Sequence, residues 1–195
     1  MLICNSINKS YDKQIIFNNF SYVFPDKGFI ALFGKSGCGK TTLLNIIAGT
    51  TNFDSGSIEY CNKSYKNKFQ SDDISYITQD ACFIDFLTVK ENLELSTLDD
   101  DLMLSMLKKF NIIDKINNYP STLSGGEKQR LALIRALLLK KSIILLDEPT
   151  AALDRQNTIV IFELLKKLSK DILVICSSHD KKVLHFADQI IDFSK

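Results

Sequence analysis

The sequence predicts an α/β fold, in which a parallel sheet carries helices on its faces. Short apolar runs of strand length alternate with segments of helical periodicity along the 195 residues. The apolar runs are residues 29–33, 143–146 and 172–176, and the helices are expected after Lys40, Asp154 and Asp180. Ligands of such sheets bind outside the carboxyl ends of the strands, so we expect a functional site there.

The N-terminal part of the chain predicts a second β structure. Residues 2–7 and 19–24 have the composition of strands and are separated by Asn, Lys and Ser. Residues 55–62 begin with Ser-Gly-Ser and add a turn and a further strand. Together these segments predict an antiparallel β edge lobe beside the parallel sheet.

Between Thr88 and Tyr119 the pattern becomes helical. Thr88 and Glu91 have the spacing of a capping box, and residues 102–110 are amphipathic at helical period. We therefore expect a single domain over residues 1–195, with a helical subdomain inserted at about 86–122.

Composition excludes several classes of partner. Lys and Arg total 24 and Asp and Glu total 23, so a net charge of +1 predicts no nucleic-acid partner. The five cysteines are scattered and show no C-x-x-C spacing, which favours a reducing, cytoplasmic setting without disulfides or zinc.

The apolar runs are also far shorter than the roughly 20 residues of a membrane-spanning helix. The first residues lack the basic segment of a secretory signal, so a chain without its own membrane span is expected. The chain ends sixteen residues after His179 (195 minus 179), which predicts no accessory regulatory domain.

A glycine-rich motif follows the first apolar run. Residues 34–41, Gly-Lys-Ser-Gly-Cys-Gly-Lys-Thr, match G-x-x-x-x-G-K-[ST] between a predicted strand and a predicted helix. Backbone N–H groups of such a loop surround a phosphate, Lys40 can reach the β and γ phosphates, and the Thr41 hydroxyl can bind magnesium. A plain glycine-rich turn is the alternative. The predicted nucleotide-binding residues are Gly34, Lys35, Ser36, Gly37, Cys38, Gly39, Lys40, Thr41 and Thr42.

Two adjacent acids end the apolar run 143–146. We expect Asp147 to hold the magnesium ion and Glu148 to polarise or deprotonate the attacking water. The alternative is that both acids simply cap the loop after a buried strand.

The run 123–130, Leu-Ser-Gly-Gly-Glu-Lys-Gln-Arg, indicates which kind of nucleotide-binding protein this is. Taken alone it predicts a helix start, with Ser124 as N-cap, Glu127 closing a capping box, and Gly125 and Gly126 leaving backbone amides open to an anion. The run resembles the LSGGE-x-Q-R signature of the ABC (ATP-binding cassette) ATPases. A plain helix cap is the alternative.

The resemblance covers nearly the whole chain and implies a P-loop NTPase (RecA-like) core that binds ATP and Mg²⁺. It implies that Tyr11 stacks on adenine, that Gln79 acts in catalysis and on magnesium beside Thr41 and Asp147, and that His179 acts as the switch histidine. Residues 152–154 resemble the D-loop of the family. Each of these residues also has an ordinary interpretation: half-buried packing for Tyr11, a solvated side chain for Gln79, and a satisfied polar residue for His179.

The resemblance further implies a head-to-tail dimer, formed with a second copy or a homologous cassette. Ser124, Gly125 and Gly126 would then act in trans on the nucleotide of the other chain, in place of an arginine finger, so a monomer is expected to bind ATP but to hydrolyse it poorly. The implied setting is cytoplasmic, peripheral on the inner face of the cell membrane, with a separate transmembrane permease subunit.

The segment 79–87 resembles the surface that receives the membrane subunit. Its apolar residues are Phe83, Ile84, Phe86 and Leu87, for which a small local core is the alternative. Within the family, the chain looks most similar to small bacterial exporter cassettes for lipoproteins, macrolides or bacteriocin-like peptides.

Two other functions stay open at this point. One is a soluble ABC ATPase with a mechanical or assembly role, although the chain has neither a second cassette nor a long coiled coil. The other is a binding module that does not hydrolyse ATP, which the presence of Lys40, Asp147, Glu148 and His179 argues against. Cargo and direction of transport are not encoded in these motifs.

Overall fold

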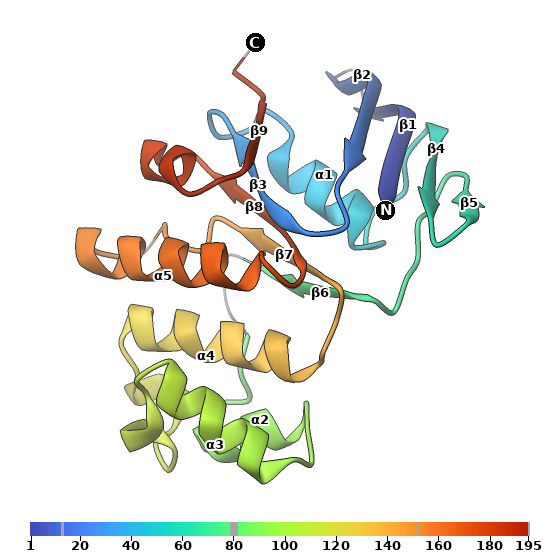
Figure 1. Cartoon of the computed structure of the whole chain (residues 1–195). Helices are drawn as coiled ribbons and strands as arrows, with labels where there is room; N and C mark the ends of the chain where they lie inside the picture. The colour runs from blue at the N-terminus through green and yellow to red at the C-terminus, as the bar shows by residue number, and fades with distance from the viewer. Residues whose placement is uncertain (13, 79–81, 152, 195) are drawn as a thin grey trace.

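The computed structural model describes residues 1–12, 14–78, 82–151 and 153–194, and these form two sheets with helices around them (Figure 1). A five-stranded parallel sheet has the order β6-β7-β8-β3-β9, and a four-stranded antiparallel sheet has the order β2-β1-β4-β5. The parallel strands are β3 (Gly28–Phe33), β6 (Ile74–Ile77), β7 (Ile143–Asp147), β8 (Leu173–Ser178) and β9 (Gln189–Asp192). The antiparallel strands are β1 (Leu2–Tyr11), β2 (Gln14–Phe24), β4 (Ser55–Tyr60) and β5 (Lys63–Tyr65).

The three predicted apolar runs are the three central strands of the parallel sheet. β3, β7 and β8 are buried on both faces, which explains why they consist of nearly continuous Ile, Leu, Val and Phe. The flanking strands β6 and β9 were not predicted, since each is only four residues long and β9 is mostly exposed.

The antiparallel sheet confirms the predicted edge lobe, but its first two strands are longer than expected. β1 and β2 pair over most of their length and include the polar stretches expected between strands. Their burial alternates because one face packs on the core and the other faces solvent. Polar residues therefore occupy the solvent face without interrupting the strands.

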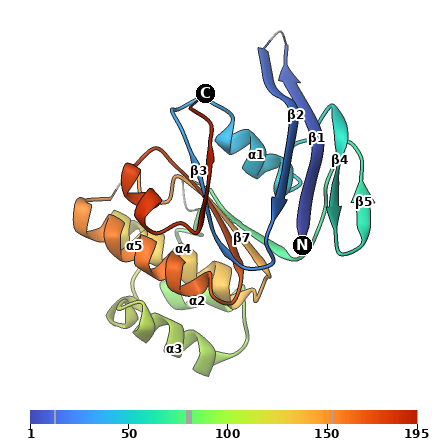
Figure 2. The same ribbon diagram turned by 45° about the horizontal axis from the view of Figure 1, so that its top comes forward.

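Two apolar cores lie on opposite faces of the parallel sheet. Helix α1 (Lys40–Ile47) lies between the two sheets, where Ile143 and Leu145 share a core with residues of α1, β1 and β4 (Figure 2). The intervening residues, Ile144 and Leu146, share the other core with α4 (Gly125–Leu138) and α5 (Arg155–Leu168). The period-two alternation of β7 thus decides which helix each side chain contacts.

The region between β6 and α4 is helical, as predicted. α2 (Val89–Glu94) and α3 (Asp100–Lys109) pack beyond α4, farthest from the antiparallel sheet, and are followed by the 3₁₀ turns Ile113–Lys115 and Pro120–Thr122 (Figure 1). The predicted capping box is present: the Thr88 side chain accepts from the Glu91 N–H, and the Glu91 carboxylate accepts from the Thr88 N–H.

The helix expected after Asp180 is present, but it is a short 3₁₀ helix, Lys181–His185. The reason is the nearby edge strand. The Asp188 N–H donates to the Phe29 carbonyl at 2.7 Å, which commits the chain to β9 from Gln189 onward. Too few residues remain after Asp180 for a longer helix.

None of the helices in the described ranges combines the length and the apolar character needed to cross a bilayer.

Candidate functional site

The glycine-rich loop joins β3 to α1 at the carboxyl edge of the parallel sheet. Gly37 and Gly39 have φ angles of 80° and 106°, in the region that other residues rarely adopt. A Cβ on Gly39 would lie 2.9 Å from Ile16 Cγ2, so this position has no room for a side chain. The loop can therefore direct its backbone amides toward a bound anion at the start of α1.

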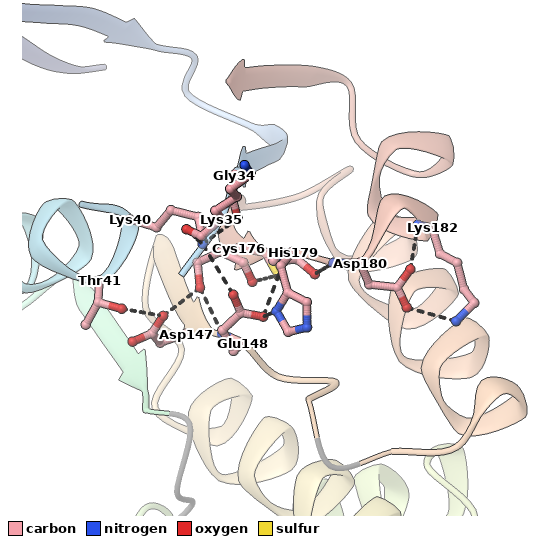
Figure 3. Close-up of polar contacts among 12 residues, drawn as sticks. Gly34, Lys35, Lys40, Thr41, Asp147, Glu148, Cys176, His179, Asp180 and Lys182 are labelled. Atoms are coloured by element: carbon pink, nitrogen blue, oxygen red, sulfur yellow. Dashed lines mark hydrogen bonds and ion pairs between the residues drawn. The ribbon is translucent and has the colours of Figure 1, made fainter. Parts of the chain in front are cut away.

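The predicted loop residues differ in exposure. Lys35, Ser36, Gly37 and Thr41 are exposed, Cys38 and Thr42 are half-buried, and Gly34, Gly39 and Lys40 are buried. The Lys40 side chain is only 5% exposed. Its ammonium donates to the carbonyls of Gly34 at 2.8 Å and Lys35 at 3.0 Å, and lies 3.5 Å from Glu148 Oε1 (Figure 3). A positive charge is thus held inside the loop where a phosphate group would lie.

Asp147 ends β7 directly across from the start of α1. Its Oδ1 accepts a hydrogen bond from the Thr41 hydroxyl at 3.1 Å (Figure 3). The same oxygen accepts from the Ser177 hydroxyl at 2.6 Å. A carboxylate and a hydroxyl from two facing elements are oxygen donors of the kind that Mg²⁺ prefers. The residues present therefore fit a magnesium ion held by Thr41 and Asp147.

Glu148 lies between two basic groups. Its Oε1 is 3.5 Å from the Lys40 ammonium, and its Oε2 is 2.9 Å from His179 Nδ1 (Figure 3). The Glu148 side chain is 15% exposed and the His179 side chain is 63% exposed, so the Glu148–His179 pair extends from the interior to the surface. A carboxylate placed in this way can accept a proton from water, and the imidazole can bind the same oxygen or the reacting groups.

The two acids place negative charge in a nearly dry region. Burial, followed by the charges of Glu148 and Asp147, raises the pKa of the Cys176 thiol well above its usual range. Burial and the Asp147 charge likewise raise the pKa of Tyr76, whose hydroxyl donates to Asn45 Oδ1 at 3.0 Å. Both groups therefore stay neutral near pH 7 and add no further negative charge beside the acids.

Ser177 belongs to this cluster and was missed by sequence reasoning. Besides donating to Asp147, its hydroxyl accepts from the Glu148 N–H at 2.8 Å. The signal that could have found it is a hydroxyl residue at the end of the buried apolar strand β8, two residues before His179.

Ser124, Gly125 and Gly126 lie apart from these residues. They begin α4, which packs on the opposite face of the parallel sheet from α1 (Figure 2). Ser124 caps α4 with the predicted capping box, and the Ser124 N–H lowers the pKa of Glu127 by donating to its carboxylate at 2.8 Å. Gly126 is buried, and a Cβ there would lie 3.1 Å from Asn157 Cγ, so α4 approaches α5 closely at this point.

The remaining predicted residues are placed as follows. Tyr11 ends β1 with an exposed ring, and the Lys9 ammonium lies 4.6 Å from its ring centroid. Gln79 lies outside the described residues. Of the segment 152–154, Leu153 and Asp154 are described, and Asp154 caps α5 by accepting from the Asn157 N–H at 2.8 Å.

The apolar residues expected at the membrane-subunit surface divide into two kinds. Phe83 packs against the core beside α4, with the Arg135 guanidinium 4.8 Å from its ring centroid. Phe86 is 81% exposed. Ile84 and Leu87 are half-buried. Phe83 therefore belongs to a local core, whereas Phe86 is an exposed apolar side chain.

A phosphate-binding loop that faces two acids across the ends of parallel strands defines a nucleoside triphosphatase of the P-loop class. Comparison with known proteins narrows this class. The profile of the ABC transporter family matches residues 17–151. The chain belongs to the ABC transporter family, and it is an ATP-binding and ATP-hydrolysing subunit.

Individual relatives agree with this membership. The chain is 38% identical over 203 aligned positions to the lipoprotein-releasing system ATP-binding protein LolD of Buchnera aphidicola subsp. Acyrthosiphon pisum, covering 93% of the chain and 89% of the relative. It is 34% identical to the putative hemin import ATP-binding protein HrtA of Staphylococcus aureus, covering 98% and 96%.

Solved structures agree as well. The ATP-binding cassette MJ0796, in a dimeric post-hydrolysis state bound to ADP and Pi, superimposes with a TM-score of 0.84 at 30% identity, covering 98% of this chain and 94% of that one. CbiO1 from Clostridium perfringens superimposes with a TM-score of 0.86 at 23% identity, covering 98% and 83%, and supports the fold alone.

Proposed function

We propose that the chain binds Mg-ATP at the carboxyl edge of its parallel sheet. The backbone of residues 34–39 and the Lys40 ammonium would bind the phosphates, and the exposed Tyr11 ring would stack on the adenine. The Thr41 hydroxyl and the Asp147 carboxylate would hold Mg²⁺, with Gln79 as a further ligand. When bound, the ion would neutralise charge on the transferring phosphoryl group.

Glu148 and His179 would carry the chemistry of hydrolysis. The observation that supports this most is the place of the Glu148 carboxylate between Lys40 and His179, at 3.5 and 2.9 Å. There Glu148 would accept the proton of the attacking water, while His179 would hold the carboxylate and contact the phosphoryl group. Gln79 would help to place the water.

We infer that hydrolysis requires two chains. Ser124, Gly125 and Gly126 begin helix α4, which packs on the opposite face of the parallel sheet from α1. Within one chain these residues therefore lie on a different surface from the phosphate loop. Their open amides would stabilise the phosphoryl charge of the nucleotide held by the other chain. The dimeric state of the similar MJ0796 cassette supports a pair of chains, which we propose is head-to-tail.

We further propose that the dimer drives a separate transmembrane subunit from the cytoplasmic face of the membrane. The segment 79–87, with its exposed Phe86, would receive that subunit. The likeness to the lipoprotein-releasing protein LolD supports an exporter.

A capture experiment tests the membrane partner. A tagged Glu148→Gln variant, loaded with Mg-ATP to keep the dimer closed, is incubated with detergent-solubilised native membranes and with cytosol, and the retained proteins are identified by mass spectrometry. The control is Glu148→Gln with Lys40→Ala, which is expected to bind ATP poorly. Retention of an integral membrane protein by the first variant alone supports the proposal, whereas retention of ribosomes, DNA complexes or a soluble scaffold contradicts it.

A further inference from the structure

Ser177 connects the two acids of the site through one oxygen atom. Asp147 and Ser177 are direct neighbours across the parallel pair β7 and β8. The Ser177 side chain is fully buried, at 0% exposure. Its hydroxyl donates to Asp147 Oδ1 at 2.6 Å and accepts from the Glu148 N–H at 2.8 Å. A hydroxyl carries one hydrogen and two lone pairs, so it can make both bonds at once.

We propose that Ser177 is a positioning residue for ATP hydrolysis, which holds the Asp147 carboxylate and the Glu148 backbone in their working arrangement. This inference rests on the roles proposed above for Asp147 and Glu148. Ser177 itself does not contact the reacting groups in this role.

The backbone of Glu148 explains why a holding group is needed. Glu148 has a φ of 48°, in the left-handed region that a residue with a long side chain adopts only when its surroundings enforce it. Its N–H has a well-placed acceptor in the Ser177 hydroxyl. With an apolar residue at 177 this N–H would lose that acceptor in a nearly dry region, and the left-handed conformation would lose a stabilising contact.

The same hydroxyl restrains the proposed metal ligand. Thr41 approaches Asp147 Oδ1 from α1 at 3.1 Å, whereas Ser177 approaches the same oxygen from the interior of the sheet at 2.6 Å. The bond from Ser177 is charge-assisted and short, and hence the stronger of the two. Asp147 is thus fixed to the sheet and presented toward α1 and the phosphate loop.

The pattern of β8 makes the hydroxyl at this position unusual. Leu173 and Ile175, which lie on the same face of the strand as Ser177, belong to the apolar core around α1. An apolar residue would continue this pattern, so the hydroxyl at position 177 indicates a polar role for this side chain. The neighbouring Ser178 has a different role, since its Oγ accepts a hydrogen bond from the Asp180 N–H at 3.0 Å.

A pair of variants with equal volume isolates the hydroxyl. Ser177→Thr keeps the oxygen, and Ser177→Val replaces it with a methyl group of nearly the same size. Ser177→Ala adds no volume and is expected to behave like Ser177→Val. We expect kcat to be roughly tenfold lower in Ser177→Val than in Ser177→Thr, and the Mg²⁺ concentration for half-maximal activity to be higher, with ATP affinity measured without Mg²⁺ equal within about twofold.

A second measurement does not depend on activity. Hydrogen exchange of the Glu148 amide, followed by NMR in nucleotide-free protein, is expected to be roughly tenfold faster in Ser177→Val than in Ser177→Thr. The control is Ser169→Ala, which removes another buried serine hydroxyl, bonded to the Lys166 carbonyl at 2.9 Å on the distant end of α5. It should leave kcat, the Mg²⁺ requirement and this exchange rate unchanged.

Equal kcat and equal exchange in Ser177→Thr and Ser177→Val would overturn the inference, even if the wild-type chain hydrolyses ATP and Glu148→Gln does not. That result leaves the proposed function intact. If Glu148→Gln instead keeps wild-type turnover, the role proposed for Glu148 is wrong, and the positioning role proposed for Ser177 is then wrong as well.

Discussion

At the scale of single residues, the proposed hydrolysis depends most directly on Glu148 and His179. The Glu148 carboxylate binds His179 Nδ1 on one oxygen and faces Lys40 on the other, so its orientation depends on both partners. Loss of either partner would leave the carboxylate free to turn. The histidine is the more informative of the two to remove, because Lys40 is also expected to bind the nucleotide directly.

For His179→Ala we therefore predict a kcat roughly ten- to a hundredfold lower, with ATP affinity within about twofold of wild type. Steady-state hydrolysis and equilibrium binding of a fluorescent ATP analogue would measure the two quantities. His185→Ala is the matched control, since the chain has two histidines and His185 is exposed at the end of the 3₁₀ helix. Unchanged turnover in His179→Ala would contradict the role proposed for this imidazole.

Asp188 shows a residue-scale effect on stability rather than chemistry. A hydrogen bond from the Lys166 ammonium, and a second from the Phe29 N–H, lower the pKa of its carboxyl group. The carboxylate thereby joins α5 and the start of β3 to the turn before β9. A lowered pKa in the folded state means that folding favours the ionised form, and that the resulting stabilisation disappears as the pH falls through the folded-state pKa.

We predict that Asp188→Asn is less stable than wild type at pH 7, and that the difference shrinks below about pH 4, where the unfolded-state carboxyl begins to protonate. Urea unfolding at several pH values would measure this. Asp171→Asn serves as the control: Asp171 is an exposed acid whose mutation should change stability little at any pH. A stability difference that stays constant down to pH 3 would contradict the assignment.

At the scale of elements, the loop before α2 depends on Asn92. This buried side chain accepts from the Ile84 N–H at 2.9 Å and donates to the carbonyls of Ile84, Leu87 and Thr88 at 3.0 to 3.1 Å. One amide therefore satisfies both backbone groups of Ile84. From the other side, Arg135 of α4 donates to the Cys82 carbonyl at 2.5 Å and covers Phe83. The loop that presents Phe86 is thus held by two helices.

For Asn92→Ala we predict a loss of roughly 3 kcal/mol in the free energy of unfolding, because the amide's contacts with the backbone disappear and the Ile84 N–H loses this acceptor. Urea unfolding would measure it. Asn118→Ala is the control, since its side chain makes an exposed hydrogen bond to Thr122 Oγ1 at 3.3 Å, and a loss below about 0.5 kcal/mol is expected. Equal losses in the two variants would show that Asn92 does not organise the loop.

At the scale of the whole molecule, the phosphate loop and the start of α4 belong to different faces of the parallel sheet. Under the proposed function, both act on one nucleotide when two chains pair. The expected pair is antiparallel and uses the carboxyl edge of each sheet.

We predict that Glu148→Gln elutes as a dimer with Mg-ATP and as a monomer without nucleotide, measured by size-exclusion chromatography with light scattering. For the wild-type chain, ATP turnover per molecule should rise with protein concentration until the dimer dominates. Ser124→Arg, which places a bulky charge at the proposed contact, should abolish both effects while leaving ATP binding within about twofold of wild type. Full turnover by a chain shown to be monomeric would contradict the dimer.

How well the sequence predicts the structure also depends on the scale of the feature. Local signals were reliable where chemistry or capping demands particular residues: the loop of residues 34–41 follows a strand and begins a helix, and the capping boxes at Thr88 and Ser124 are both present. Strand β9 was not found, and the helix expected before it is only a short 3₁₀ helix, since the form of this segment depends on pairing with β3 rather than on its own pattern.

What the sequence by itself determined is the class of chemistry, the central strands and the positions of the helices, because each of these depends on neighbouring residues and on hydrophobic period. What only the tertiary structure decided is which side chains meet. Ser177 and Asp147 are thirty residues apart (177 minus 147), and only the pairing of β7 with β8 makes them neighbours. The left-handed backbone of Glu148 is likewise accompanied by a hydrogen bond that its N–H donates to that distant serine, which no local pattern encodes.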